Sequence, residues 1–265
     1  MRLIELASDY VAEKEVSQGY EDQLFRAVRR LQDYVGRELS EFPLEKVNGF
    51  LKREVELTSR FNARTYRQRI LTLWNYGADR GLWDYPKARR IRRFSLELPV
   101  PEAIPKEHIR ALVDGAGALT GMYNEKTNRS DYWAAVIIGA FDLGFRRGDI
   151  WRVPRKIVDG QPFAFREHKE KRLQCRQLST EGCDLLQKIH LGDYAYKFPF
   201  GETSWRKHWS EVVDASGLDI PYKFKQLRKS HGTYAKTLGH ASNKVFEDFY
   251  FDPKLGLEPS GPGEL

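Results

Sequence analysis

The chain has 265 residues, enough for one or two domains with hydrophobic cores of their own. Lys and Arg outnumber Asp and Glu by 44 to 37, and the net charge of +7 favours an anionic partner such as nucleic acid over a basic surface without one. Two cysteines are too few for a disulfide framework or a four-ligand zinc site, and the most apolar stretch, 133–145, is too short to span a bilayer. We therefore expect a cytoplasmic protein without membrane segments.

The first third of the chain predicts a small bundle of amphipathic helices. Apolar residues recur at helical spacing over about residues 19–37, again after Pro43, and over about 62–82. On the third of these helices the arginines fall largely on the outward side, and they are Arg64, Arg67 and Arg69. These exposed cations are candidates for contact with DNA phosphates.

A basic segment, KARRIRRF, follows the bundle and contains Arg89, Arg90, Arg92 and Arg93. Each cation that meets a phosphate releases a counterion, so the segment can be a DNA-binding edge; a solvated charged face is the other interpretation. The next residues, SLELPVPEAIP, are rich in proline and lack a helical period, which is typical of a linker. We therefore expect a helical domain over 1–97, a linker over 98–104 and a second domain over 105–265.

The second domain is predicted to begin with two helices. Pro105 opens the first, and Ser130 caps a strongly apolar second helix over 131–143. Gly144 suits the end of that helix, and Arg146 and Arg147 follow at once.

A small three-stranded antiparallel sheet is predicted next. Its strands are 149–155, 162–166 and 172–178, and the turn EHKEK between the last two presents Lys169 and Lys171. Helices are then predicted over about 180–190, 203–215, 224–236 and 242–250. The fold class is therefore mainly α with a minor sheet, or α+β.

Five sequence elements, in order, resemble the tyrosine recombinase (phage-type integrase) family. They are GFRRGDI, the hairpin with its lysine turn, QLRKSHGTYA, LGHAS and YFDP. A single one of these motifs is weak evidence, whereas the ordered set over nearly the whole chain is strong. The helical domain before them resembles that family's core-binding (SAM-like) DNA-binding domain.

The resemblance implies a site for cutting and rejoining DNA. The two catalytic arginines would be Arg146 and Arg228, and the hairpin lysine would be Lys169. Lys225 stands at the position of the first histidine, His240 at that of the second, and Tyr250 at that of the nucleophile. Lys171 is a close second choice for the lysine, and Arg147 and Lys229 are further candidates for DNA contact.

The chemistry of these residue types fits the assignment. Two always-charged guanidiniums can stabilise the extra negative charge of a phosphodiester transition state. Tyr250 would attack phosphorus to form a 3′-phosphotyrosyl link, Lys169 would protonate the leaving 5′-oxygen, and His240 would assist. The resemblance requires no cofactor, and no His/Cys cluster or acidic triad for a metal is evident in the sequence.

Three positions depart from the family's pattern. Lys225 stands where histidine is usual, the segment from Arg228 to His240 is short, and Tyr250 comes one residue late, with Phe249 in the expected register. A non-catalytic DNA-binding relative is therefore the main alternative, and a relaxing topoisomerase is a third. The implied partner is double-stranded DNA with a specific target site, bound by a tetramer across two duplexes; without DNA the protein would be a monomer or weak dimer.

Overall fold

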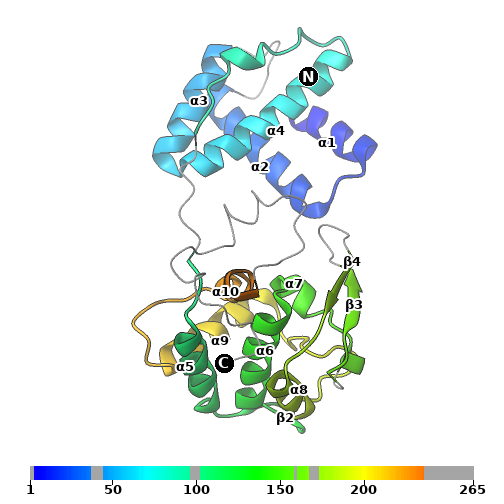
Figure 1. The fold of residues 1–265 in the computed structure, drawn as a ribbon. Helices are drawn as coiled ribbons and strands as arrows, with labels where there is room; N and C mark the ends of the chain where they lie inside the picture. Colours follow the sequence, from blue (N-terminus) through cyan, green and yellow to red (C-terminus); the bar gives the residue numbers. More distant parts are fainter. Residues whose placement is uncertain (1–2, 37–43, 96–101, 158–159, 167–172, 236–265) are drawn as a thin grey trace. The chain divides into compact units, whose positions relative to one another are not determined.

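The computed structural model describes residues 3–36, 44–95, 102–157, 160–166 and 173–235. The chain divides into two compact units, Met1–Glu97 and Leu98–Leu265. The helices of the first unit are α1 (Leu3–Lys14), α2 (Gln18–Val35), α3 (Leu44–Leu57) and α4 (Arg60–Asp79), followed by the short 3₁₀ helix η1 (Ala88–Arg90) (Figure 1). The three predicted amphipathic helices are thus present, and α1 is an additional helix.

The apolar faces of these helices form the core of the first unit. Leu24 and Leu31 of α2, Phe50 of α3 and Leu73 of α4 are buried together at 2% exposure or less. Ser59 caps α4, since its hydroxyl accepts a hydrogen bond from the Asn62 amide at 3.1 Å. The unit is therefore a helical bundle held by one hydrophobic core.

An ion pair between a partly exposed arginine and a buried acid joins α2 to α3. The Arg30 guanidinium donates to both carboxylate oxygens of Glu54, at 2.9 and 3.0 Å, and Glu54 is 2% exposed. This paired geometry satisfies an acid that would otherwise be costly to bury.

The second unit contains the longer run of elements. They are α5 (Lys106–Gly117), β1 (Met122–Asn124), β2 (Thr127–Asn128), α6 (Arg129–Leu143), α7 (Arg147–Ile150), η2 (Arg155–Ile157), β3 (Phe163–Arg166), β4 (Leu173–Arg176), α8 (Thr180–Gln187), α9 (Glu202–Ala215) and α10 (Lys225–Ala235). Helix α6 is central: it contacts α5, α7, α8, α10 and β2, and Figure 1 shows it in the middle of the unit. Twelve of its fifteen residues are buried, which explains its strongly apolar sequence.

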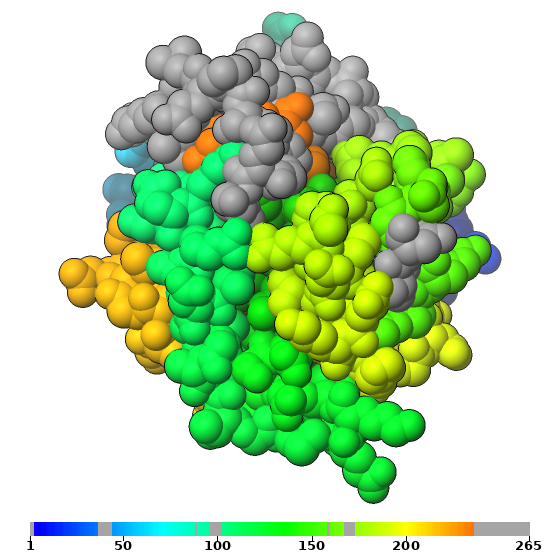
Figure 2. All heavy atoms as spheres, turned by 60° about the horizontal axis from the view of Figure 1, so that its bottom comes forward, coloured from blue at the N-terminus to red at the C-terminus, as the bar shows by residue number. Residues whose placement is uncertain are grey.

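On the face shown in Figure 2, residues of α5 and α8 lie side by side, where the Arg110 guanidinium pairs with the Glu181 carboxylate at 2.5 and 3.1 Å. Ile104, just before α5, is fully buried, and its amide donates to the Ser230 hydroxyl of α10 at 2.7 Å. The last residue of the predicted linker, Ile104, is thus packed into the second unit.

The predicted three-stranded sheet is wrong. In the described residues the strands form two separate antiparallel pairs, β1 with β2 and β3 with β4. The expected strand 149–155 instead covers the end of α7, a turn and the start of η2. Its fully buried apolar residues, Ile150 and Val153, are three positions apart, whereas a strand would bury every second residue. Pro154 makes a single bridge to Tyr194 and none to β3.

The start of α6 also differs from the prediction. The helix begins at Arg129 with Asn128 as its N-cap, so Ser130 lies inside the first turn. The Asn128 amide donates to the Asp131 carboxylate at 2.9 Å instead of capping the backbone. The short β1–β2 hairpin precedes this helix, at a place where the sequence indicates only a glycine-rich break.

Candidate active site

Arg146 lies between the ends of two helices. Gly144 ends α6 in the left-handed conformation at φ 61°, with its amide bonded to the Ala140 carbonyl at 3.1 Å. The Arg146 carbonyl then accepts hydrogen bonds from the amides of Asp149 and Ile150, both at 2.9 Å, and so opens α7. The backbone that carries the Arg146 side chain is therefore held on both sides.

Helix α10 brings Arg228 to the same backbone segment. The Arg228 side chain is buried at 4% exposure, and its Nη1 donates to the Gly144 carbonyl at 2.5 Å. This contact joins residues 84 positions apart. A guanidinium from α10 therefore lies against the backbone two residues before Arg146.

Two more side chains bind the carbonyl end of α6. His231 of α10 bonds through Nδ1 to the Phe141 carbonyl at 2.7 Å, and Arg176 of β4 donates from Nε to the Leu143 carbonyl at 3.0 Å. These carbonyls belong to the last turn of α6 and lack partners within the helix. Cationic groups are favoured there because the helix dipole leaves partial negative charge at this end.

His231 is a neutral member of this group. Burial lowers the pKa of its imidazole to about 3, and the nearby Arg176 charge adds to the effect. A carbonyl can only accept, so Nδ1 carries the proton. The ring packs against Gly144, where an added Cβ would lie 2.3 Å from the imidazole Cδ2. Glycine at 144 therefore serves both the left-handed turn and this close approach.

Ser230 and His231 do not form a nucleophile and base pair. The Ser230 hydroxyl donates to the Gln226 carbonyl at 3.0 Å, while the His231 imidazole is bonded to Phe141. Both side chains attach α10 to its surroundings, since the Ser230 hydroxyl also accepts from the Ile104 amide.

Asp142, one turn before Arg146, connects α6 to α8. Its carboxylate accepts from the Ser179 amide at 2.9 Å and from the Ser179 hydroxyl at 2.6 Å, and that hydroxyl caps α8 at Gly182. Burial raises the pKa of Asp142 to about 6, against the lowering effect of the Ser179 hydrogen bonds.

The other predicted residues of this unit lie in different settings. Lys225 is the exposed first residue of α10, one turn before Arg228, and Lys229 is half-buried. The Arg147 guanidinium pairs with Glu202 at 2.9 Å and lies over the Trp151 ring at 5.3 Å. Arg147 is thus engaged by partners within its own unit. Four predicted residues lie outside the described part of the chain: Lys169, Lys171, His240 and Tyr250.

The basic segment after α4 in the first unit is pinned to the bundle. Ile91 is 1% exposed, and the Asn48 side chain donates to the Arg90 carbonyl at 3.0 Å and accepts from the Arg92 amide at 2.8 Å. The predicted DNA-contacting arginines on either side of Ile91 are all exposed, namely Arg89, Arg90, Arg92 and Arg93. Anchored backbone with outward cations suits a phosphate-binding edge.

The three arginines predicted on α4 differ from one another. Arg64 is exposed, whereas the Arg67 Nε donates to the Ile91 carbonyl at 3.4 Å, and burial together with the Arg93 charge lowers the pKa of Arg67. The Arg69 guanidinium donates to Gln23 at 2.7 Å and lies 3.9 Å from the centre of the Tyr20 ring. Arg64 is therefore the most accessible of the three.

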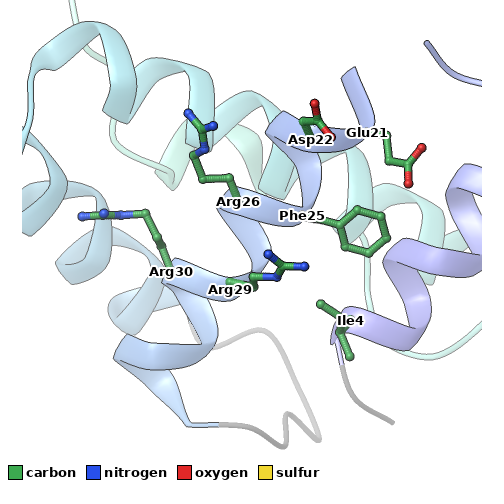
Figure 3. A pocket seen from close by; sticks show the side chains of 7 residues that line it. All are labelled: Ile4, Glu21, Asp22, Phe25, Arg26, Arg29 and Arg30. Carbon is green, nitrogen blue, oxygen red and sulfur yellow. The ribbon is translucent and has the colours of Figure 1, made fainter. Parts of the chain in front are cut away.

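A pocket of about 720 Å³ lies on α1 and α2, and none of its lining residues is among the predicted site residues (Figure 3). Phe25, Arg29 and Ile4 face the same space in Figure 3. The lining contains both arginines and acidic residues, and Arg30 is paired with Glu54. The pocket therefore has no strong net charge of either sign. Its residues are Ile4, Glu21, Asp22, Phe25, Arg26, Arg29 and Arg30.

Within the described ranges, no cluster of three or more His, Cys, Asp or Glu side chains could hold a metal ion. None of the helices in those ranges combines the length and the apolar character needed to cross a bilayer.

Comparison with solved structures identifies the fold of the chain. A crystal structure of a lambda integrase dimer bound to a core site matches 97% of this chain and 98% of its own, with a TM-score of 0.76 and 14% identity. A XerH site-specific recombinase, bound to its palindromic difH substrate, matches 88% of this chain and 77% of its own, with a TM-score of 0.66 and 15% identity. The chain has the tyrosine recombinase fold. Neither a protein-family model nor a curated protein matches the sequence.

Within this tyrosine recombinase fold, Arg176 and His231 are the site-associated residues that the sequence did not reveal. Arg176 carries no motif, and His231 has significance only through its contact with the end of α6. A weak signal was available in Gly144, since a predicted helix-ending glycine implies exposed carbonyls that need partners.

Proposed function

We propose that the protein is a site-specific DNA recombinase or integrase that cuts and rejoins DNA through a 3′-phosphotyrosyl intermediate. The observation that carries the proposal is the contact between the Arg228 guanidinium and the Gly144 carbonyl, just before Arg146. Two arginines from distant parts of the sequence are thereby associated with one backbone turn, and together they would form a cationic clamp for a phosphate. The tyrosine recombinase fold supports the proposal.

In the proposed reaction, Arg146 and Arg228 bind the non-bridging oxygens of the scissile phosphate. The Tyr250 oxygen attacks phosphorus, its proton leaves with the help of His240, and a phosphotyrosyl ester forms as the bond to the 5′-oxygen breaks. Lys169 donates the proton that the leaving 5′-oxygen takes up. The reverse attack by a 5′-hydroxyl restores the phosphodiester, so neither step consumes a nucleotide.

DNA with a specific site is the proposed partner. The solved lambda integrase structures are described as a dimer on a core site and a tetramer on a Holliday junction. By analogy, residues 1–97 would be the core-binding domain and 105–265 the catalytic domain, acting as a tetramer on two duplexes. The exposed arginines beside Ile91 would supply phosphate contacts on the first of these domains.

One observation favours a non-catalytic DNA-binding protein as the second candidate. Lys225, at the usual histidine position, is exposed at the start of α10. A lysine side chain there can bind a phosphate oxygen, but it lacks the two ring nitrogens with which an imidazole donates and accepts protons. This alternative predicts salt-sensitive binding without cleavage.

A suicide substrate separates the two functions. The binding site is first selected from random duplex DNA, and a nick is then placed close to the cleavage point so that the cut cannot be resealed. A covalent protein–DNA adduct on a denaturing gel is expected for the wild type, and the Tyr250→Phe variant should bind DNA equally but form no adduct. Binding without adduct by the wild type would support the second candidate, and supercoil relaxation without strand exchange would indicate a topoisomerase.

A further inference from the structure

The β3–β4 hairpin is attached to the end of α6 by Arg176. Arg176 is the last residue of β4, paired in register with Phe163 of β3. Its Nε donates to the Leu143 carbonyl and its Nη1 to the Cys175 carbonyl, both at 3.0 Å, and its Nη2 donates to the Gln174 side chain. One planar group thus binds the hairpin's own strand and the helix end at the same time.

Arg176 and Arg228 occupy neighbouring positions on this helix end. Arg176 binds the carbonyl of Leu143, and Arg228 binds the next carbonyl, that of Gly144. The backbone that they hold leads directly to Arg146. A displacement of Arg176 would therefore be transmitted to the peptide that Arg228 contacts.

Aromatic packing provides a second link at the same place. The Phe165 ring of β3 lies against the Phe145 ring, with 4.5 Å between centroids. Phe145 is 2% exposed and immediately precedes Arg146. The Phe163 ring of β3 also meets Phe145, at 6.5 Å between centroids, so the hairpin is fixed to this turn by a polar group and by aromatic contacts.

We propose that Arg176 is a positioning residue of the proposed DNA-cleavage site, which sets the β3–β4 hairpin and the Gly144–Arg146 turn in a fixed relation. The proposed function assigns Lys169, which falls between β3 and β4 in sequence, to the same site as the two arginines, so Arg176 would affect the chemistry through this hairpin. The inference rests on the proposed function for its catalytic consequence. The mechanical link itself does not depend on it.

Arginine is the residue that this role requires. Three nitrogens of one rigid plane reach three acceptors, and the guanidinium stays charged at every relevant pH. Lysine in its place retains the charge but has a single flexible ammonium, so it cannot hold the strand and the helix end in one geometry. Methionine retains much of the length and removes all three hydrogen bonds.

The test compares Arg176→Lys and Arg176→Met with Arg152→Met, which removes an exposed arginine of the same unit. Three quantities are measured on the full chain: the Kd for the selected DNA site, the single-turnover rate of adduct formation on the suicide substrate, and amide hydrogen exchange over residues 143–147 and 173–176. Thermal unfolding of each variant identifies any loss of the folded state.

We expect both Arg176 variants to form adduct about 10- to 100-fold more slowly, because small displacements of reacting groups have effects of this size. Their Kd should stay within about threefold of the wild type, and exchange should quicken at both segments together. Arg152→Met should match the wild type in all three quantities. A purely structural role would instead lower the unfolding temperature and weaken DNA binding along with the rate.

Wild-type adduct rates in folded Arg176→Lys and Arg176→Met proteins would overturn the inference, as would unchanged exchange at 143–147. Failure of the proposed function has a different signature, since the wild type itself would then form no adduct. In that case faster exchange at both segments would still support the link between hairpin and turn, and unchanged exchange would reject it.

Discussion

At the scale of single residues, two buried titratable groups near the end of α6 have pKa values shifted in opposite directions. Burial lowers the pKa of His231 from 6.5 to about 3 and raises that of Asp142 from 3.8 to about 6. Desolvation favours the neutral form of both groups, and because an imidazole is neutral when deprotonated and a carboxyl when protonated, the two pKa values move in opposite directions. Stability near this turn should therefore depend on pH in two separable ways.

For His231, the unfolded chain binds a proton between about pH 6.5 and 3 that the folded chain does not. Its contribution to stability is present above pH 6.5 and is lost on acidification, by up to about 1.4 kcal/mol per pH unit. We predict that His231→Phe reduces the loss of unfolding free energy between pH 7 and 5, measured by urea denaturation. Parallel curves for variant and wild type would contradict this.

For Asp142, the folded chain binds a proton between about pH 4 and 6 that the unfolded chain does not. Its neutral form favours folding below about pH 4, and this advantage is lost as the pH rises through 6. We predict that Asp142→Asn gains stability relative to the wild type as the pH is raised from 4 to 7 in the same assay. A relative change of the opposite sign would show that the carboxyl is ionised in the folded state throughout.

Gly144 and His231 should be energetically coupled. Gly144→Ala places a Cβ at φ 61° and 2.3 Å from the imidazole, which should cost about 1–3 kcal/mol of unfolding free energy. In a His231→Ala background the steric part is removed, so a double-mutant cycle should give a coupling of about 1 kcal/mol or more. Additive effects within about 0.5 kcal/mol would show that the contact carries no energy.

At the scale of elements, the helices were predictable because their apolar residues recur at helical spacing. Helices α2, α4 and α10 lie within a few residues of their predicted bounds, and the β3–β4 strands lie inside theirs. The segment 149–155 is predicted as a strand because it contains β-branched and aromatic residues. The three-residue spacing of its buried residues, Ile150 and Val153, becomes evident only in the folded core. Arg176 and His231 were not predictable as site residues, since their partners are backbone carbonyls distant in sequence.

The α2–α3 connection in the first unit gives a prediction at this scale. Arg30→Met leaves the buried Glu54 carboxylate without its paired donor, which should cost about 1–3 kcal/mol because Arg30 itself is partly solvated. Arg26→Met, on the exposed side of the same helix, is the control and should change stability by about 0.5 kcal/mol or less. Urea denaturation measures both, and equal effects would show that the ion pair contributes nothing.

At the scale of the whole molecule, the net charge of +7 favours an anionic partner, and the proposed function names DNA as that partner. The first unit has a basic segment whose backbone is anchored by Asn48. In the second unit, Arg228 and Arg146 lie at the C-terminal end of α6. Because the arginines of the two units are proposed to have different roles, substitutions in the two units should change different measured quantities. Those in the basic segment should weaken binding, and those at the helix end should slow the chemistry.

The salt dependence of DNA binding tests the first of these statements. Arg92→Gln/Arg93→Gln should reduce the slope of log K against log salt by up to about two, since each lost phosphate contact removes about 0.9. The matched double variant Arg26→Gln/Arg29→Gln, on α2, should leave the slope unchanged. Equal slopes for both doubles and the wild type would place the DNA elsewhere on the surface.

The measurement that tests the central claim most directly is the location of the covalent bond. The suicide-substrate adduct is digested with nuclease and trypsin, and the modified peptide is sequenced by mass spectrometry. Trypsin releases residues 245–254, VFEDFYFDPK, in which Tyr250 is the single tyrosine. The account predicts a nucleotide phosphate on Tyr250 and a large loss of adduct in Arg146→Ala and Arg228→Ala. A phosphate on a different residue, or adduct formation that survives the loss of both arginines, would contradict it.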